Sequence, residues 1–406
     1  MGIGTLLGYL IGSRSAILTL ADHPHARLIG LVFVLSAGFA REYDGEDLLH
    51  EPWYLAIPLG ASLISSLVLF GVLYVPSRLR GADAPPFVAA YRAFLGLFWM
   101  TAPLAWLYAV PYERLLDPVS AVYANVSTLA LVSIWRIALM VRVGVVLFGL
   151  SPWAALFRVV AYADSVALVA LNFLPFPIIE IMGGVRVSEA DAVVRNAAQL
   201  IAVWGGCSLL VWWLLAFVAG NRNSWALPGR KDASPGDIER QAGSLSWPLR
   251  ILGIVSLAVW IPILPFTQPQ QQVRWRVDSA FQEGRFRDAL TEMSAHERDD
   301  FPPQWEPPPH FLKGERQASV LDIWEEILDN DPAPWVREHY LERLREFIER
   351  SRYNWEDEKV AKLLNQMPEG PALLRKWAAE PNMQWQLERI DSHLRPELRT
   401  TNPKAN

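Results

Sequence analysis

Asp164 is the residue of this chain whose type and position point most directly to chemistry. It lies inside an apolar stretch long enough to cross a membrane. An ionisable group in such a stretch is costly, and it usually faces the interior of a helix bundle or a water-filled cavity. The arginines of the same hairpin, Arg136, Arg142 and Arg158, are its candidate partners. Two interpretations stay open: a polar site that relays a proton or an ion, and a structural salt bridge.

A second group of chemical residues lies in the acidic stretch 41–53. On a helix, Asp47, His50 and Glu51 would share a face, and carboxylate with imidazole suits a divalent metal. The alternative is an acidic loop outside the membrane, with Trp53 and Tyr54 at the lipid interface. We favour the second interpretation and expect neither a metal nor another cofactor.

Hydrolytic motifs are incomplete. His50-Glu51-Pro52 lacks the second histidine of a zinc protease helix. Ser62 follows Gly60 as in rhomboid-type intramembrane proteases, but such chemistry needs a histidine base deep within a span, and the sequence places none there. A cluster at 175–184, with two prolines and two glycines, could open a helix to an ion or could be a kinked helix end. We therefore expect a protein that is not an enzyme.

The elements that must position these residues are long apolar runs. The central stretch, 120–176, contains two such runs joined at a short hinge, Gly149 to Pro152, with arginines on both sides. Arginines between two spans are typical of the cytoplasmic face of a membrane. The stretch therefore predicts a helical hairpin whose turn lies in the cytoplasm.

The rest of the first 267 residues repeats this pattern. Seven spans are expected, at about 28–40 (starting near His23), 54–75, 87–110, 121–141, 160–182, 198–220 and 251–266. Lysine and arginine gather in alternate loops, which predicts a cytoplasmic N-terminus and an extracytoplasmic tail. Residues 1–22 predict an amphipathic helix lying in the interface, and residues 23–267 a transmembrane helix bundle.

Residues 268–406 predict a small soluble α-helical domain. Residues 280–290 look like a helix-turn-helix of tetratricopeptide type, although no second copy follows at the expected period. Apolar residues at helical spacing predict further helices at 320–328, 335–348, 360–364 and 373–377. Tryptophans of this tail could anchor a protein partner where exposed, although most should be core: Trp305, Trp324, Trp335, Trp355, Trp377 and Trp385.

Composition limits the function classes. The 406 residues carry a net charge of −5 and no basic block, so a nucleic-acid partner is not expected. The single cysteine, Cys207, cannot form an internal disulfide bond.

The hinge and the span after it, residues 147–177, resemble the central segment of Yip-family multi-span membrane proteins. The resemblance rests on a Gly/Ser turn, an aromatic residue, an arginine and the run Val159-Val160-Ala161-Tyr162-Ala163. Pro152, Asp164 and the extra C-terminal domain depart from the family pattern. The resemblance implies a non-enzymatic helix bundle that acts through partners.

Together these features predict an all-α, polytopic protein of the inner (plasma) membrane of a bacterium. The leading hypothesis is a scaffold that binds a protein partner through its tail. The alternative is a transporter of a small solute or an ion that uses Asp164 and the arginines of the hairpin.

Overall fold

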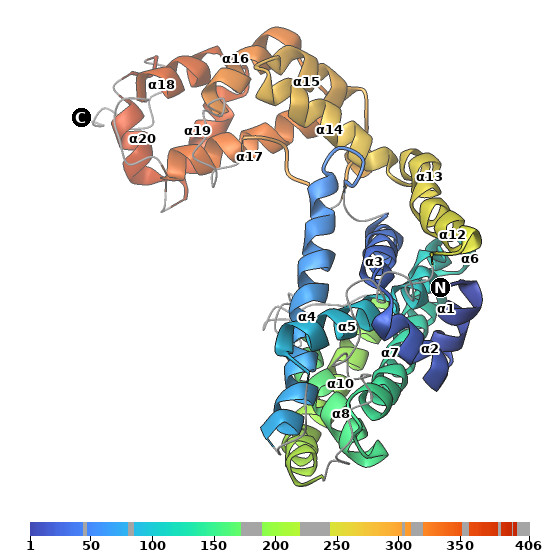
Figure 1. The fold of residues 1–406 in the computed structure, drawn as a ribbon. Coiled ribbons are helices and arrows are strands. Elements are labelled where there is room, and N and C mark those ends of the chain that lie inside the picture. Colours follow the sequence, from blue (N-terminus) through green and yellow to red (C-terminus); the bar gives the residue numbers. More distant parts are fainter. Residues whose placement is uncertain are drawn as a thin grey trace. The chain divides into compact units, whose positions relative to one another are not determined.

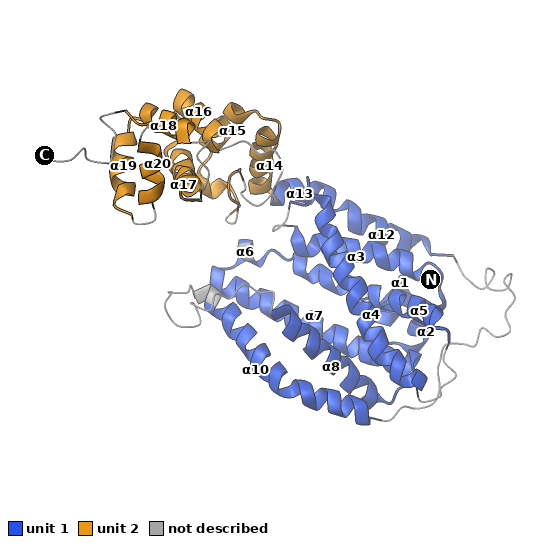
Figure 2. Ribbon diagram, turned by 90° about the vertical axis from the view of Figure 1, so that its left-hand side faces the viewer, with its two compact units in different colours: residues 1–267 blue, residues 268–406 orange. Residues whose placement is uncertain are grey.

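The computed structural model describes residues 1–43, 47–79, 85–171, 189–219, 244–302, 305–309, 320–350, 357–380, 383–391 and 393–395. In this part of the chain every regular element is a helix, as the sequence predicts (Figure 1). The chain divides into two compact units, Met1–Thr267 and Gln268–Asn406 (Figure 2). We call them the bundle and the tail.

The bundle opens with three helices, α1 (Ile3–Leu10), α2 (Arg14–Asp22) and α3 (Ala26–Glu42). The single helix expected over residues 1–22 is thus two helices, because the chain turns at Gly12, whose φ of 78° favours glycine. Leu6, Ile17 and Leu20 are buried in the core of the bundle. These apolar side chains therefore pack against protein.

Six segments are long and apolar enough to cross a membrane within the described residues: η1 with α4 (Pro52–Leu55, Ala56–Leu79), α5 with η2 (Phe87–Trp99, Ala102–Ala109), α7 (Pro118–Leu147), α8 (Pro152–Leu171), α10 (Glu189–Val218), and α12 with α13 (Trp247–Ala258, Trp260–Thr267). A short helix, α6 (Tyr112–Leu115), precedes α7. Helices α2 and α3 meet at 103° and would be a seventh span if the pair crosses as one. The prediction of an all-helical chain with several apolar helices long enough to span a membrane is confirmed, and the number of spans, including the first, stays a prediction.

The predicted hinge separates α7 from α8. Helix α7 ends at Leu147 and α8 begins at Pro152. Gly149 has a φ of 61°, and the backbone N–H of Ala154 donates to the Ser151 hydroxyl at 3.2 Å. Serine before a proline at the first helical position is a typical helix start.

Hydrogen bonds gather distant segments at the hinge end of the bundle. The Arg142 side chain donates to the Gly12 carbonyl at 3.0 Å, and Trp135 donates to the Leu10 carbonyl at 2.9 Å. The backbone N–H of Ser246 donates to the Met1 carbonyl at 2.9 Å. At the opposite end, the Thr267 hydroxyl donates to the Tyr43 carbonyl at 3.0 Å. The first residues, the hinge and the start of α12 therefore share one end.

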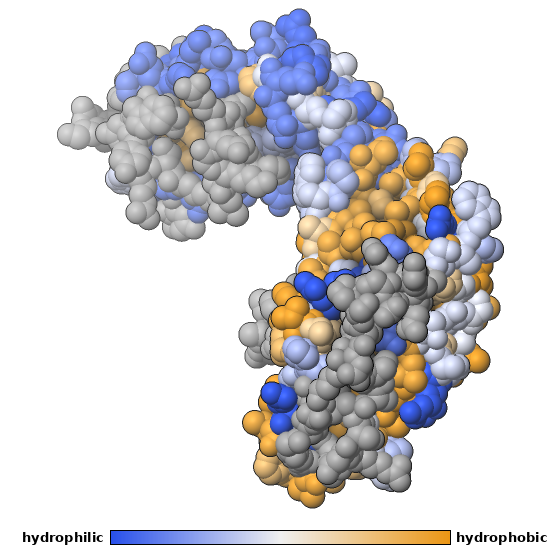
Figure 3. Space-filling model, in the orientation of Figure 1, coloured by the Kyte–Doolittle hydropathy of each residue, from blue (hydrophilic) through white to orange (hydrophobic). Residues whose placement is uncertain are grey.

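Phe70 of α4 is a centre of the bundle core. Its fully buried ring lies 4.9–6.0 Å, between centroids, from five other aromatic rings: Tyr74, Phe87, Tyr91, Phe94 and Phe148. These rings join α4, α5 and the hinge. The outward surface is also apolar, most of all on α4 and α10, and Figure 3 shows hydrophobic residues over the bundle and hydrophilic ones over the tail. An apolar outer surface fits contact with lipid.

The tail is a row of helices: α14 (Pro269–Gln282), α15 (Phe286–Ser294), η3 (Arg298–Asp300), α16 (Val320–Asn330), α17 (Pro334–Arg350), α18 (Asp357–Gln366), α19 (Gly370–Ala378) and α20 (Gln384–Asp391). Helices α14 and α15 are joined at Gly284, whose φ is 74°. From α14 to α20, each helix packs chiefly on helices one or two places away in the chain. One continuous core runs through the row, with Trp324 and Tyr340 fully buried.

Candidate functional site

Asp164 lies where α8 packs against α10. Its Oδ2 atom accepts a hydrogen bond from the Ser208 hydroxyl at 2.9 Å. Gly205, one turn earlier on α10, leaves room for the carboxylate: a Cβ atom at this position would lie 2.6 Å from Asp164 Oδ1. Among the described residues, the hydrogen-bond partner of this carboxylate is therefore a hydroxyl beside a glycine.

The contact between these two helices continues as a polar seam. The Ser165 hydroxyl donates to the Ala161 carbonyl at 2.7 Å and accepts from the Trp213 indole at 3.1 Å. We define the α8–α10 seam as Asp164, Ser165, Gly205, Ser208 and Trp213. Interhelical hydrogen bonds and small residues are typical means of joining helices in a membrane, so the seam joins α8 to α10.

The three arginines of the predicted polar site lie in different surroundings. Arg136 lies over the Phe98 ring, 5.4 Å from its centroid, and Arg142 holds the Gly12 carbonyl. Arg158 is buried and is one of the residues that line a pocket of about 400 Å³, whose other lining residues are mainly apolar residues of α4 and α10. Among the described residues, no ion pair joins Asp164 to any of these arginines. The structure gives the carboxylate an uncharged partner from α10.

Ser208, Gly205 and Trp213 are members of the seam that sequence reasoning missed. The sequence feature that could have indicated a helix contact here is the group of small residues Gly205, Gly206 and Ser208 within one span, since such residues allow close approach of helices. Hydropathy alone does not show which helix they face. The neighbour of α8 is settled only by the packing of the whole bundle.

Asp47 and His50 come together in the loop after α3. His50 Nδ1 lies 3.0 Å from Asp47 Oδ1, and the Asp47 side chain is fully buried. The same carboxylate accepts the backbone N–H of His50 at 3.1 Å, which closes a local turn. The Glu51 backbone N–H donates to the Asp47 carbonyl. In the part of the chain that the structure describes, no three metal-binding side chains are grouped, and residues 44–46 lie outside it.

The tryptophans of the tail divide into core and surface residues. Trp305, Trp324 and Trp377 are buried, Trp335 is half-buried, and Trp355 lies outside the described residues. Trp385 is 55% exposed, and the guanidinium of Arg389 lies over its ring at 4.7 Å. Trp385 is therefore the exposed aromatic anchor that the structure offers among these six.

No known protein family, curated protein or solved structure matches this chain. The resemblance to Yip-family proteins therefore stays a prediction, and its last residues, 172–177, lie outside the described part.

Proposed function

We propose that this protein is a non-enzymatic membrane scaffold, whose bundle holds the tail at the membrane and whose tail binds a protein partner. The observation that carries the proposal is the arrangement of α14 to α20, in which each helix packs chiefly on helices one or two places away in the chain. Helices stacked in this way are typical of α-solenoids, whose extended surfaces bind other proteins. The exposed Trp385 adds an aromatic residue of the kind that dominates interface energies.

The proposal includes a topology. The hinge end of the bundle carries Arg14, Arg78, Arg142 and Arg250 near the ends of its helices. Because lysine and arginine mark the cytoplasmic side of a span, we assign this end to the cytoplasm. With seven crossings, the tail then lies outside the cytoplasm, facing the periplasm of a bacterium with two membranes.

Site-specific photo-crosslinking in native membranes tests this function. A photoreactive residue replaces Trp385 in the tail, and a matched one replaces Leu214 of α10, a 65% exposed apolar residue. We expect a discrete protein adduct from position 385 and lipid adducts alone from position 214. The absence of any protein adduct from position 385 and from a second exposed tail position, Glu388, would contradict a scaffold that binds through its tail.

The α8–α10 seam favours a second candidate function, transport of a proton, another small ion or a small solute. A carboxylate on a spanning helix, hydrogen-bonded to a hydroxyl, is a group that can hold and release a cation. Ion flux into proteoliposomes, followed with an internal pH dye, separates the two functions. A transporter would show flux that Asp164→Asn abolishes. A scaffold would show no flux, and Asp164→Asn would leave its crosslink at position 385 intact.

A further inference from the structure

A groove in the tail is lined by cationic and amide side chains. Its walls are the exposed side of α18 and the turn after α20, and its volume is about 420 Å³. We call it the basic groove and define it by its lining residues: Glu358, Lys359, Lys362, Asn365, Gln366, His393 and Arg395. Grooves of this size are within the range of ligand sites in proteins.

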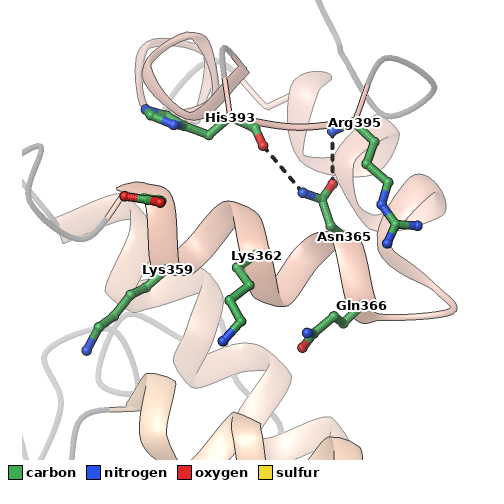
Figure 4. Close-up of a pocket in the computed structure, with 7 residues that line it drawn as sticks. Lys359, Lys362, Asn365, Gln366, His393 and Arg395 are labelled. Carbon is green, nitrogen blue, oxygen red and sulfur yellow. Dashed lines mark hydrogen bonds between the residues drawn. The ribbon is translucent and has the colours of Figure 1, made fainter.

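Asn365 fixes the two walls of the basic groove to each other. Its amide Nδ2 donates to the His393 carbonyl at 3.4 Å, and its Oδ1 accepts the backbone N–H of Arg395 at 3.0 Å. Figure 4 shows Asn365 reaching from α18 to the turn, with Lys359 and Lys362 projecting from the same helix. The backbone that carries Arg395 is thus held at a set position relative to the two lysines.

The charge of the basic groove is unlike that of the unit around it. The tail as a whole carries 20 lysines and arginines against 26 aspartates and glutamates. The groove has three cations, Lys359, Lys362 and Arg395, and one carboxylate, Glu358. A concentration of positive charge on an acidic unit attracts negatively charged ligands.

The cations of the groove also differ from other arginines of the tail in their pairing. Three arginines elsewhere in the tail form close ion pairs: Arg337 with Glu369 at 2.7 Å, Arg389 with Asp357 at 2.5 Å, and Arg345 with Glu380. Lys362 lies 3.7 Å from Glu325, and both side chains are more than half exposed. Such exposed pairs contribute little. Within the described residues, no ion pair includes Lys359 or Arg395, so these charges are available to an external carboxylate.

From this groove we infer that the tail binds an acidic segment of a protein partner, with Lys359, Lys362 and Arg395 holding its carboxylates. Charge-assisted hydrogen bonds from lysine and arginine to carboxylates are about twice as strong as neutral ones. The amides of Asn365 and Gln366 can bind the backbone of the same segment. This inference rests on the proposed scaffold function and names the chemistry of its partner.

The test uses the full chain in a neutral detergent and fluorescence anisotropy of a labelled hexaglutamate peptide. Lys359→Gln with Lys362→Gln is compared with Arg375→Gln with Lys376→Gln. The second pair is also exposed, lies on α19 outside the groove, and removes the same charge. We expect the groove double variant to bind at least tenfold more weakly, Arg395→Gln at least threefold, and the α19 double variant within twofold of the unaltered chain.

Three results would overturn the inference. The first is equal binding of hexaglutamate and hexaglutamine by the unaltered chain. The second is an equal loss in the α19 double variant, which would show attraction by overall charge alone. The third is displacement of the peptide by inorganic phosphate at concentrations where acetate has no effect, which would assign the groove to phosphate groups. If any of these results is obtained and the protein crosslink at position 385 is still observed, the scaffold function is supported and the acidic segment is excluded as its partner.

Discussion

Gly205 lacks a side chain where one would collide with the carboxylate of Asp164. Gly205→Ala should therefore force Asp164 away from Ser208 and loosen α8 from α10, with a cost of about 1–3 kcal/mol, as for other overpacked sites. Gly206→Ala is the matched control, since a Cβ atom there has no neighbour within 4 Å and alanine favours the helix. Thermal unfolding in detergent should show a lower midpoint for Gly205→Ala alone. Equal midpoints for the two variants would refute the close approach.

His339 of α17 is a half-buried imidazole in the tail. Its Nε2 atom has no hydrogen-bond partner among the described residues. Burial lowers its pKa from 6.5 to about 4, assisted by the positive charges of Arg343 and Arg298, while Glu306 acts in the opposite direction. The folded tail therefore keeps this histidine neutral at pH values where the unfolded chain protonates it.

The pH dependence follows from that difference. Above pH 6.5 both states are neutral, and between about pH 6.5 and 4 the unfolded chain binds a proton that the folded chain does not, so stability falls as the pH falls. A shift of this size corresponds to at most about 3–4 kcal/mol. His339→Gln should lose this part of the dependence, whereas His393→Gln, which alters an exposed ring, should keep it. Urea unfolding followed by pulse proteolysis at pH 7 and pH 4.5 measures both; identical pH profiles for all three chains would exclude the proposed cause.

At the scale of elements, the start of α18 is tied to α20 by one buried ion pair. Arg389 donates to both carboxylate oxygens of Asp357, at 3.1 and 2.5 Å, and little of either side chain is exposed. Asp357→Asn should destabilise the tail by roughly 3–5 kcal/mol, because it leaves a buried guanidinium without its counter-charge.

The matched comparison for this pair is Asp288→Asn, which breaks the exposed pair with Arg285. Exposed pairs contribute little to stability because solvent screens them. Limited proteolysis of the tail at increasing urea should separate the two variants by several kilocalories per mole. A small effect of Asp357→Asn would mean that α18 and α20 are held by their apolar contacts alone.

Most helices of the bundle could be predicted from hydropathy, but their ends could not. The fifth span was expected to start near Val160, whereas α8 begins at Pro152 and carries Arg158 inside. The charge of Arg158 suggested that the span begins after this residue, at the edge of the membrane. In the structure the Arg158 side chain is buried within the bundle. Likewise α10 begins at Glu189, nine residues before the expected span, because a polar stretch continues the same helix. Mean hydropathy identifies the apolar part of a helix. It does not identify the polar turns by which the same helix continues at its ends.

In the tail, the four helices expected between residues 320 and 377 all form. Helix α20 was missed, since Leu387 and Ile390 alone are too few to show a period. The candidate site was only partly predictable. Asp164 was identified because an ionisable residue in an apolar span is energetically costly. Its partner Ser208 lies 44 residues away, on a helix that the sequence alone could not pair with α8.

At the scale of the whole molecule, the proposed topology makes two statements that reporters can check. Alkaline phosphatase fused after Gln272 should be active, and the same enzyme inserted near Asp232 should be silent, because α12 and α13 separate these positions by one crossing. If phosphatase is inactive at both positions, α12 and α13 do not cross the membrane.

The crossing of α2 and α3 needs a separate measurement. Cys207 is replaced by alanine, and Gly4, around which a side chain meets no neighbour, becomes the single cysteine. A membrane-impermeant maleimide should fail to label Gly4→Cys in intact cells and label it after lysis, if the bent pair crosses. Labelling in intact cells would leave six spans.

The contact between α3 and α12 also has a consequence for biosynthesis. Ser36 of α3 donates its hydroxyl to the Ser256 carbonyl at 2.6 Å, and Trp260 lies beside it. About 220 residues separate these partners, so at ~5–20 residues per second the ribosome delivers the second roughly 10–45 seconds after the first. Until then, a helix of 17 residues with an unmatched serine is a poor membrane segment. Final insertion of α3 should therefore wait for α12. In an arrested nascent chain that ends before α12, a cysteine placed in α3 should react with a membrane-impermeant maleimide, and in the full chain it should not.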